Sequence, residues 1–165
     1  MKKLIVDSCT IILLAKASVL ETASESYILL ITQEVYKEVL EGKTKQFKDA
    51  LLTERLKETN KIKIVKPDTI LMNKLMKDFN MGEGEASTVA IAIKDKNTIT
   101  ATDNKQGRNA TKINNMPLVG SPDIIVALCK QKKINIYKAT AALKIIQEKG
   151  WFDTYLIEKS LEDLK

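Results

Sequence analysis

Five short apolar runs recur along the chain, and residues with helical spacing separate each run from the next. The runs are 4–6, 27–31, 61–65, 98–101 and 117–119, and their aliphatic and β-branched content predicts strands. Between and after them the spacing predicts an apolar segment over 9–20, a helix from an N-cap at Thr32 to Leu40, and helices over 85–94, 104–113, 122–131, 138–149 and 154–164. Strands that alternate with helices favour a parallel sheet covered on both faces. The expected fold is therefore a three-layer α/β/α, Rossmann-like domain with a central parallel sheet of about five strands.

Two further helices are predicted from their apolar faces. In the first, Phe47, Ala50 and Leu51 share one face. The second follows Asp68 and carries apolar residues at helical spacing: Ile70, Leu71, Leu75, Met76 and Phe79. Both faces are expected to pack against the core.

The composition excludes several kinds of site. The chain contains no histidine, which excludes Ser-His-Asp and Cys-His catalysis, histidine bases and histidine-ligated zinc. Cys9 and Cys129 lack CxxC spacing, which favours small core thiols in a reducing cytoplasm. Asp7 interrupts the apolar start of the chain, and no apolar run approaches the roughly 18 residues that span a membrane. We therefore expect a cytoplasmic protein without a membrane partner, whose chemistry depends on carboxylates, hydroxyls, lysine or a metal held by oxygen atoms.

Acidic residues stand at the ends of the predicted strands and at the starts of helices. Asp7 follows the first strand and Asp103 follows the fourth. The functional crevice of such a sheet lies beyond the carboxyl ends of the strands, where the strand order reverses. If the first and fourth strands are neighbours there, Asp7 and Asp103 face each other. Glu85 lies in the first turn of the helix over 85–94, and Glu38 lies at the edge of the apolar stripe after Thr32.

Each acid also has an ordinary structural interpretation. Asp7 and Asp103 stand where helix N-caps stand, and Glu85, like Glu83, complements a helix dipole. The spacing alone places Glu38 on a solvated helix face. Acids that share one pocket would repel one another and raise their pKa values. A divalent cation removes that conflict, and an oxygen ligand set without His or Cys favours Mg²⁺ or Mn²⁺ over Zn²⁺.

The segments that hold these acids resemble the motifs of the PIN domain, a metal-dependent ribonuclease fold common among VapC-type toxins. The four matching segments are, in order, LIVDSCTIILLAK, VYKEVLEG, GEGEASTVAIAI and TATDNKQGRNA. The resemblance assigns the catalytic acids to Asp7, Glu38, Glu85 and Asp103, and it makes Asp7, Glu85 and Asp103 the metal ligands. The tail that begins at GSPDIIVALCKQKKI is similar to that of a PIN subgroup with a helical extension. We therefore expect 1–165 to be a single domain on which 134–165 packs.

The resemblance also implies a function. It implies an endoribonuclease that uses Mg²⁺ or Mn²⁺ and a metal-activated water to hydrolyse single-stranded RNA, leaving 5′-phosphate and 3′-hydroxyl ends. It further implies the toxin of a toxin–antitoxin pair, blocked by an antitoxin that places a basic side chain among the acids, and a homodimer. The net charge of +6, from 27 Lys and Arg against 21 Asp and Glu, favours nucleic acid or an acidic partner.

An RNA backbone that approaches an acidic pocket needs positive charge at the rim. The candidates for that charge are Lys16, Lys105 and Arg108, followed by Lys43 and Lys45. Ser8 and Ser121 are candidates for orienting water or ligands. Asn104 stands where many PIN relatives carry a second acid, and Asp123 is a candidate to replace that acid or to cap its own helix. Aromatic residues make up only 5% of the chain, which predicts no stacking platform for sequence readout.

Two other functions fit part of this pattern. A phosphatase of the haloacid dehalogenase type also carries an aspartate after its first strand, but it needs a second aspartate where this chain has Cys9. A non-catalytic PIN-like module would bind RNA or a protein without needing a metal, and Asn104, which supplies no charge, favours it. Metal affinity separates this module from the nuclease.

Overall fold

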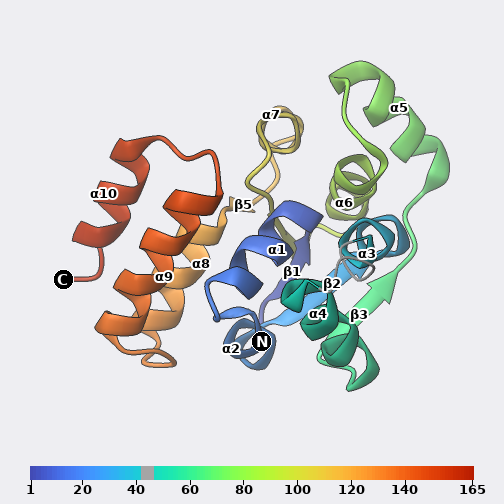
Figure 1. The fold of residues 1–165 in the computed structure, drawn as a ribbon. Helices are drawn as coiled ribbons and strands as arrows, with labels where there is room; N and C mark the ends of the chain where they lie inside the picture. Colours follow the sequence, from blue (N-terminus) through green and yellow to red (C-terminus); the bar gives the residue numbers. More distant parts are fainter. Residues whose placement is uncertain (42–46) are drawn as a thin grey trace.

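A five-stranded sheet forms the centre of the computed structural model, which describes residues 1–41 and 47–165 (Figure 1). The strands are β1 (Lys3–Val6), β2 (Ile28–Thr32), β3 (Ile62–Val65), β4 (Thr98–Ala101) and β5 (Leu118–Val119). They lie in the order β3-β2-β1-β4-β5, and every neighbouring pair is parallel. The structure confirms the predicted three-layer α/β/α fold and its parallel sheet.

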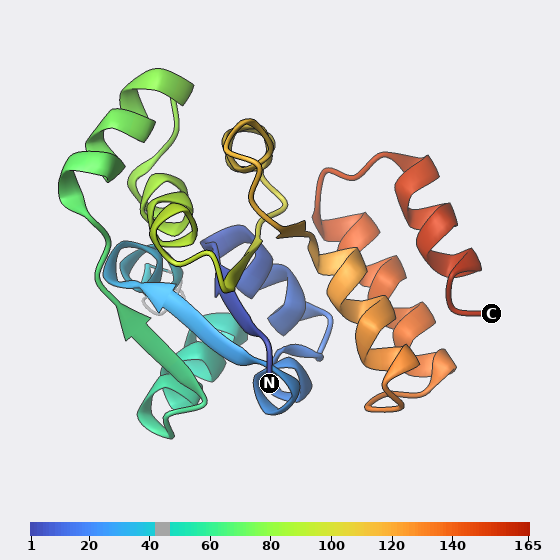
Figure 2. The same cartoon turned by 180° about the vertical axis from the view of Figure 1, so that it is seen from behind.

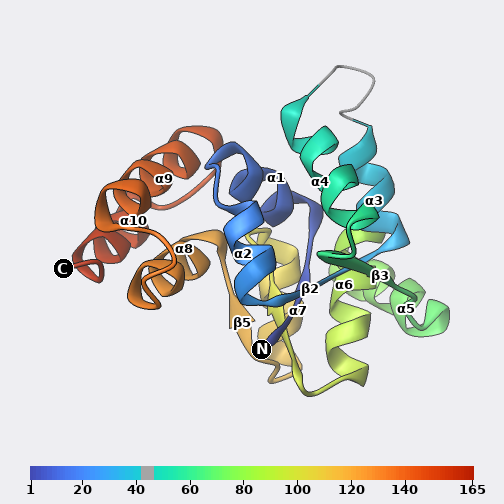
Figure 3. The ribbon, with the colours of Figure 1, turned by 90° about the horizontal axis from the view of Figure 1, so that it is seen from below.

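Helices cover both faces of this sheet. In chain order they are α1 (Ser8–Lys16), α2 (Leu20–Ser26), α3 (Gln33–Leu40), α4 (Lys48–Glu58), α5 (Thr69–Phe79), α6 (Glu83–Lys94), α7 (Lys105–Ile113), α8 (Ser121–Lys130), α9 (Ile136–Lys149) and α10 (Thr154–Glu162). Seen from below, α5, α6 and α7 lie on one side of the sheet and α1, α2 and α4 lie on the other (Figure 3). The last three helices lie side by side next to β5 (Figure 2).

The alternation of side chains along the strands divides the core between the two faces. Leu4 and Val6 of β1 belong to the larger apolar cluster, which they share with α1, α2, α4, α8 and α9. Ile5, between them, points to the opposite face and packs with Leu30 and Ala92 of α6. Successive side chains of a strand point to opposite faces, and both faces are covered by helices, so β1 and β2 are largely apolar. β3 carries the exposed Lys63, and β4 carries the buried Thr98 and Thr100.

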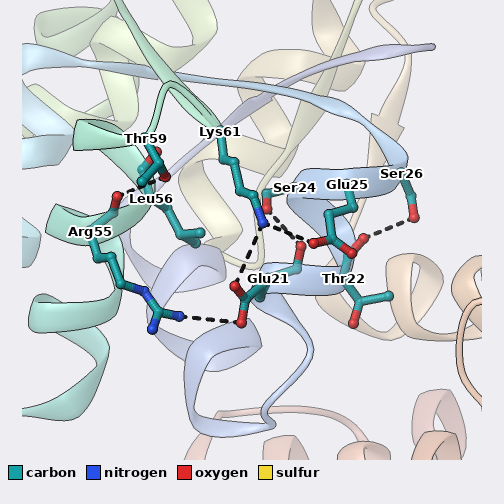
Figure 4. Close-up of polar contacts among 9 residues, drawn as sticks. All are labelled: Glu21, Thr22, Ser24, Glu25, Ser26, Arg55, Leu56, Thr59 and Lys61. Atoms are coloured by element: carbon teal, nitrogen blue, oxygen red, sulfur yellow. Dashed lines mark hydrogen bonds and ion pairs between the residues drawn. The ribbon is translucent and has the colours of Figure 1, made fainter.

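The apolar segment predicted over 9–20 covers α1 from Cys9 onward and ends at Leu20, where a second helix begins. The chain leaves α1 through Ser18, whose φ of 59° lies in the left-handed region that ends a right-handed helix. The second helix, α2, was not predicted. Exposed ion pairs tie it to its neighbours, since Lys61 lies 2.8 Å from Glu25 and Arg55 lies 3.3 Å from Glu21 (Figure 4). Exposed pairs of this kind contribute little to stability, because solvent screens them, so the packing of α2 against the core contributes most to its position.

The predicted apolar faces of two helices need correction. Phe47 precedes α4 and is exposed, as is Leu51, and the helix instead buries Ala50 and Leu56. The reason is that α4 begins at Lys48, and its contacts with α1 and α3 decide which face is buried.

In α5 the buried residues also differ from those predicted. Ile70 is 85% exposed, whereas Met72 and Leu75 pack against α6. Leu71, Met76 and Phe79 are only partly buried at the margin of that cluster. Asp68 caps α5, because its Oδ1 accepts a hydrogen bond from Leu71 N at 3.0 Å.

The strand order places a crevice between β1 and β4. Val6 pairs with Ala101 at the ends of these strands, and Asp7 N donates to Ala101 O at 3.1 Å. Next to β1 the sheet continues with β2, and next to β4 it continues with β5. The connections that leave β1 and β4 therefore diverge, and ligands bind at such a point in folds of this kind. Among the residues that the structure describes, no helix is both long enough and apolar enough to cross a bilayer.

Candidate functional site

Asp7 lies at the bottom of this crevice and is only 1% exposed. It caps α1, since its Oδ1 accepts a hydrogen bond from Thr10 N at 2.8 Å, and its Oδ2 accepts one from Thr102 Oγ1. Burial raises the pKa of the carboxyl group to about 7, and the negative charge of Asp103 adds to the rise, while the hydrogen bonds from Thr102 and Thr10 oppose it. Asp7 therefore fits both the capping and the functional interpretation. It caps α1, and its burial disfavours the charged form of the carboxyl group.

Asp103 lies across the crevice from Asp7, at the end of β4. Its Oδ2 accepts a hydrogen bond from Thr10 Oγ1 at 3.0 Å, and its Oδ1 accepts one from Ser121 N, at the start of α8, at 2.9 Å. Burial raises the pKa of this carboxyl group, although the Ser121 N–H and the charge of Arg108 hold it down. Thr10 thus joins Asp7 to Asp103, through its backbone N–H and its hydroxyl group.

Glu38 and Glu85 form a second pair of acids. Glu38 is half-buried, and its carboxylate accepts hydrogen bonds from Ser8 Oγ at 2.6 Å and from Gly84 N at 3.1 Å. The solvated position that its spacing suggested is therefore wrong. Glu85 lies in the first turn of α6, where burial and then the charge of Glu38 raise its pKa, against a hydrogen bond from the Gly82 backbone.

The first turn of α1 connects the two pairs. Ser8 donates to Glu38, and Thr10 donates to Asp103. Cys9 lies between them, and desolvation of its thiol, followed by the charges of Asp7, Asp103 and Glu85, raises its pKa to about 12. Cys9 is nevertheless exposed, so the core position that the sequence predicted for this thiol is wrong. All four predicted acids are therefore arranged around residues 8–10.

The residues of the site fit a hard divalent cation by their chemistry. No ion pair neutralises the four acids within the described part of the chain. Across the described ranges no three acids lie close enough to form a complete ligand set. Mg²⁺ commonly binds through one or two carboxylates and retains several waters, so the pair Asp7 and Asp103 suffices as an anchor.

The remaining predicted residues take different positions. Asn104 caps α7, since its Oδ1 accepts hydrogen bonds from Gln106 N and Gly107 N. Asp123 caps α8 through a 2.7 Å bond from Gly120 N and does not join the acids. Glu83 is exposed at the start of α6.

The predicted cations are also separated. Arg108 donates through Nη1 to Thr102 O at 3.1 Å, and Lys105 is exposed beside it on α7. Lys16 lies two turns along α1 from Cys9 and opposes the rise in the pKa of its thiol. Lys43 and Lys45 lie outside the described residues.

The sequence did not point to Thr10 and Thr102, although both hold the acids in place. Each stands close to a predicted acid in the sequence, at Asp7 plus three and at Asp103 minus one. A hydroxyl group at a strand end more often caps a helix, so its position beside an acid carries little signal without the strand order.

The thiol of Cys9 is expected to react slowly with a disulfide reagent. A pKa near 12 in place of 9.0 lowers the thiolate fraction about a thousandfold, and the higher nucleophilicity of the thiolate recovers part of this, which leaves a rate about 30-fold below that of a free thiol. The measurement is the reaction rate at pH 8 in a Cys129→Ser background, and Asp103→Asn is expected to raise that rate. A rate equal to that of free cysteine would show that the acids exert no combined field at Cys9.

A family model described as a PIN domain matches residues 3–165, which is nearly the whole chain. No protein of curated function matches it.

Proposed function

The chain belongs to the PIN-domain family, and on that premise we propose that it is a divalent-metal-dependent endoribonuclease that acts on single-stranded RNA. PIN domains are generally nucleases, and the family's nucleases usually use divalent metals. The observation that carries the proposal is the pair formed by the buried Asp7 and the half-buried Asp103 at the point where the strand order reverses. Burying two unneutralised carboxylates there costs free energy, and a cation-dependent activity explains why the chain keeps them.

Asp7 and Asp103 would anchor the cation, and Glu85 would act on it only through bound water, because no three acids in the described part of the chain lie close enough to form a ligand set. When bound, the cation lowers the pKa of water and offsets charge on phosphoryl oxygens. The chain's own residues fix the geometry of the carboxylates: Thr102 and Thr10 hold Asp7, Thr10 and Ser121 hold Asp103, and Ser8 and Gly84 hold Glu38. We assign Glu38 a role in orienting water, because its carboxylate is less buried than that of Asp7 and its charge acts on the neighbouring Glu85.

The test is cleavage of a 5′-labelled single-stranded RNA by the purified chain with Mn²⁺, with Mg²⁺ and with EDTA. We expect cleavage with either metal, none with EDTA, and products with 5′-phosphate and 3′-hydroxyl ends. A substrate with a 2′-deoxy residue at the cleavage position is expected to be cut as well, because water and not the 2′-hydroxyl group attacks. Cleavage that survives EDTA and yields cyclic phosphate ends would refute the proposal.

Gly84→Ala is expected to slow cleavage about tenfold to a hundredfold, as small displacements at an active site do. A Cβ atom at Gly84 would overlap the carboxylate of Glu38 and drive it out of place. Because Ala favours a helix over Gly, the thermal stability is expected to hold. The matched control is Gly82→Ala, at a position with open space for a Cβ, and it is expected to keep its activity. Equal rates in both variants would remove Glu38 from the account.

A non-catalytic RNA-binding module is the second candidate. Asn104 favours it, because the amide oxygen is already engaged in capping α7 and adds neither charge nor an available ligand. Such a module would bind RNA equally well with EDTA and with Mn²⁺ and would cleave in neither case. The phosphatase alternative gains nothing from the structure, since Cys9 stands where it needs an acid and the thiol lies among carboxylates.

We extend the proposal to a toxin–antitoxin pair, which the resemblance to VapC-type proteins implies. The unneutralised acids suit an antitoxin that inserts an Arg or Lys side chain among them. Expression of the chain alone is then expected to arrest growth of its host, and Asp103→Asn is expected to relieve the arrest.

A further inference from the structure

A cleft of about 260 Å³ opens beside Asp103, between α7 and the turn that joins α9 to α10. Its lining combines cations with aromatic rings: Lys105, Arg108 and Lys112 come from α7, and Trp151 and Phe152 come from the turn. We refer to it as the α7–α10 cleft. It is somewhat smaller than the roughly 300–1,000 Å³ typical of pockets for drug-sized ligands, and it therefore suits a group of the size of one nucleotide.

The charge of the cleft favours an anion. Lys105 and Lys112 are exposed and, like Arg108, carry positive charge. The two acids of the lining are already engaged as acceptors, since Asp103 binds Thr10 and Ser121 N, and Asp153 caps α10 through a 2.8 Å bond from Tyr155 N. The three cations outnumber the two acids, so the cleft carries net positive charge next to the acidic site.

Trp151 offers a ring without a protein partner. It is the only tryptophan of the chain, and it is 104% exposed, so water covers the whole side chain. The turn that carries it is anchored, because Phe152 is turned inward against the main apolar cluster and packs over Gly150, where a Cβ atom would collide with its ring. Trp151, next to the packed Phe152, thus presents a large flat ring to solvent beside the cations of the cleft.

We propose that the α7–α10 cleft binds the nucleotide of single-stranded RNA next to the cleaved bond, with its base stacked on Trp151 and its phosphate held by Lys105 and Lys112. This inference rests on the proposed function and adds the path of the RNA strand beyond the acids. Asp103 lies in both the cleft and the metal site, so a strand that leaves the acids enters the cleft directly. Stacking on an aromatic ring tolerates any base, and a single ring suffices for one nucleotide. The low aromatic content of the chain, which predicts no platform for sequence readout, is compatible with this single contact.

The test measures binding of a fluorescein-labelled uridine octamer and adenosine octamer to the whole chain in EDTA, where cleavage is absent. Trp151→Ala is expected to weaken binding about tenfold to a hundredfold, and Trp151→Phe is expected to restore most of it. Tyr137→Ala is the control, because Tyr137 is 83% exposed at the start of α9 and lies outside the cleft. In the unsubstituted chain, unlabelled octamer is expected to quench the fluorescence of Trp151, which is the only tryptophan.

The lysines give a second readout. Lys105→Ala and Lys112→Ala are each expected to reduce the slope of log affinity against log salt by about 0.7 for a single strand. Lys133→Ala, on the turn before α9 and outside the cleft, is expected to leave the slope unchanged.

Four outcomes would overturn the inference: no binding in EDTA, binding without a change in Trp151 fluorescence, an unchanged affinity in Trp151→Ala, or self-association that is lost in Trp151→Ala while RNA affinity is kept. The last would assign the exposed ring to a protein interface. Cleavage with Mn²⁺ is measured separately. A chain that cleaves RNA without quenching leaves the proposed function intact, and a chain that quenches without cleaving refutes only the nuclease.

Discussion

Asp7→Asn and Asp103→Asn are each expected to slow metal-dependent RNA cleavage by at least about a thousandfold, a rise of ~4 kcal/mol in the barrier. Each substitution removes one negative charge from the pair that anchors the cation and keeps the size of the side chain. The folds are expected to survive, because an amide oxygen still accepts from Thr10 N or Ser121 N, as the carboxylates do. The measurement is the single-turnover cleavage rate with saturating Mn²⁺.

The matched control for this experiment is Asp68→Asn. Asp68 is also an N-cap, of α5, and it lies apart from the four acids at an exposed position. If acids at strand ends act only as caps, all three variants lose a little stability and none loses activity. Undiminished cleavage in Asp103→Asn would therefore support capping as the whole role of that residue.

Asp7→Asn is also expected to stabilise the protein at pH 8 when no metal is present. The folded state raises the pKa of Asp7 from 3.8 to about 7, so between these values the folded state holds a proton that the unfolded state has lost. The free energy of unfolding therefore falls as the pH rises from about 4 through 7, by up to ~4 kcal/mol for a three-unit shift. The asparagine does not ionise, and the variant avoids this loss.

The measurement is the difference in Tm between wild type and Asp7→Asn, at pH 4.5 and at pH 8 in EDTA. A gain of up to ~10 °C is expected at pH 8 for a chain of this size, and little gain is expected at pH 4.5, where Asp7 is protonated in the folded state. Mn²⁺ is expected to raise the Tm of the wild type alone. An equal difference at both pH values would mean that Asp7 carries no unneutralised charge in the folded protein.

The fold could be predicted from local pattern because parallel sheets buried on both faces leave apolar runs at each strand. The facing of Asp7 and Asp103 followed from one further condition, that β1 and β4 are neighbours, and the structure satisfies it. The end of α1 could not be predicted, because Ser18 adopts a left-handed conformation that its residue type does not signal. For the same reason, α2 was not predicted as a separate helix.

The surroundings of the acids could be predicted only in part, because they depend on contacts far apart in the sequence. Glu38 appeared solvated because its partners, Ser8 and Gly84, lie 30 and 46 residues away. The same applies to Thr102, which holds Asp7 across 95 residues. Helical spacing describes one element at a time, and it cannot show that the starts of three helices meet.

Capping and catalysis proved to be compatible interpretations of the same side chain. Asp7 caps α1 and faces Asp103, whereas Asp103 leaves the capping of α7 to Asn104 and binds the start of α8 instead. The fold thus uses helix starts to hold carboxylates in place. The hydrogen bonds hold these carboxylates in place without a cation, as a preorganised metal site requires.

Whether these acids hold a divalent cation can be measured by Mn²⁺ binding, followed by electron paramagnetic resonance. The titration uses wild type, Asp7→Asn, Asp103→Asn and Asp68→Asn at pH 8, each with and without a 2′,5′-linked oligonucleotide that resists cleavage. The account predicts that wild type and Asp68→Asn deplete the free Mn²⁺ signal to the same extent, and that both site variants bind at least about tenfold more weakly. Equal Mn²⁺ binding by all four proteins, or none by wild type even with the oligonucleotide, would contradict it.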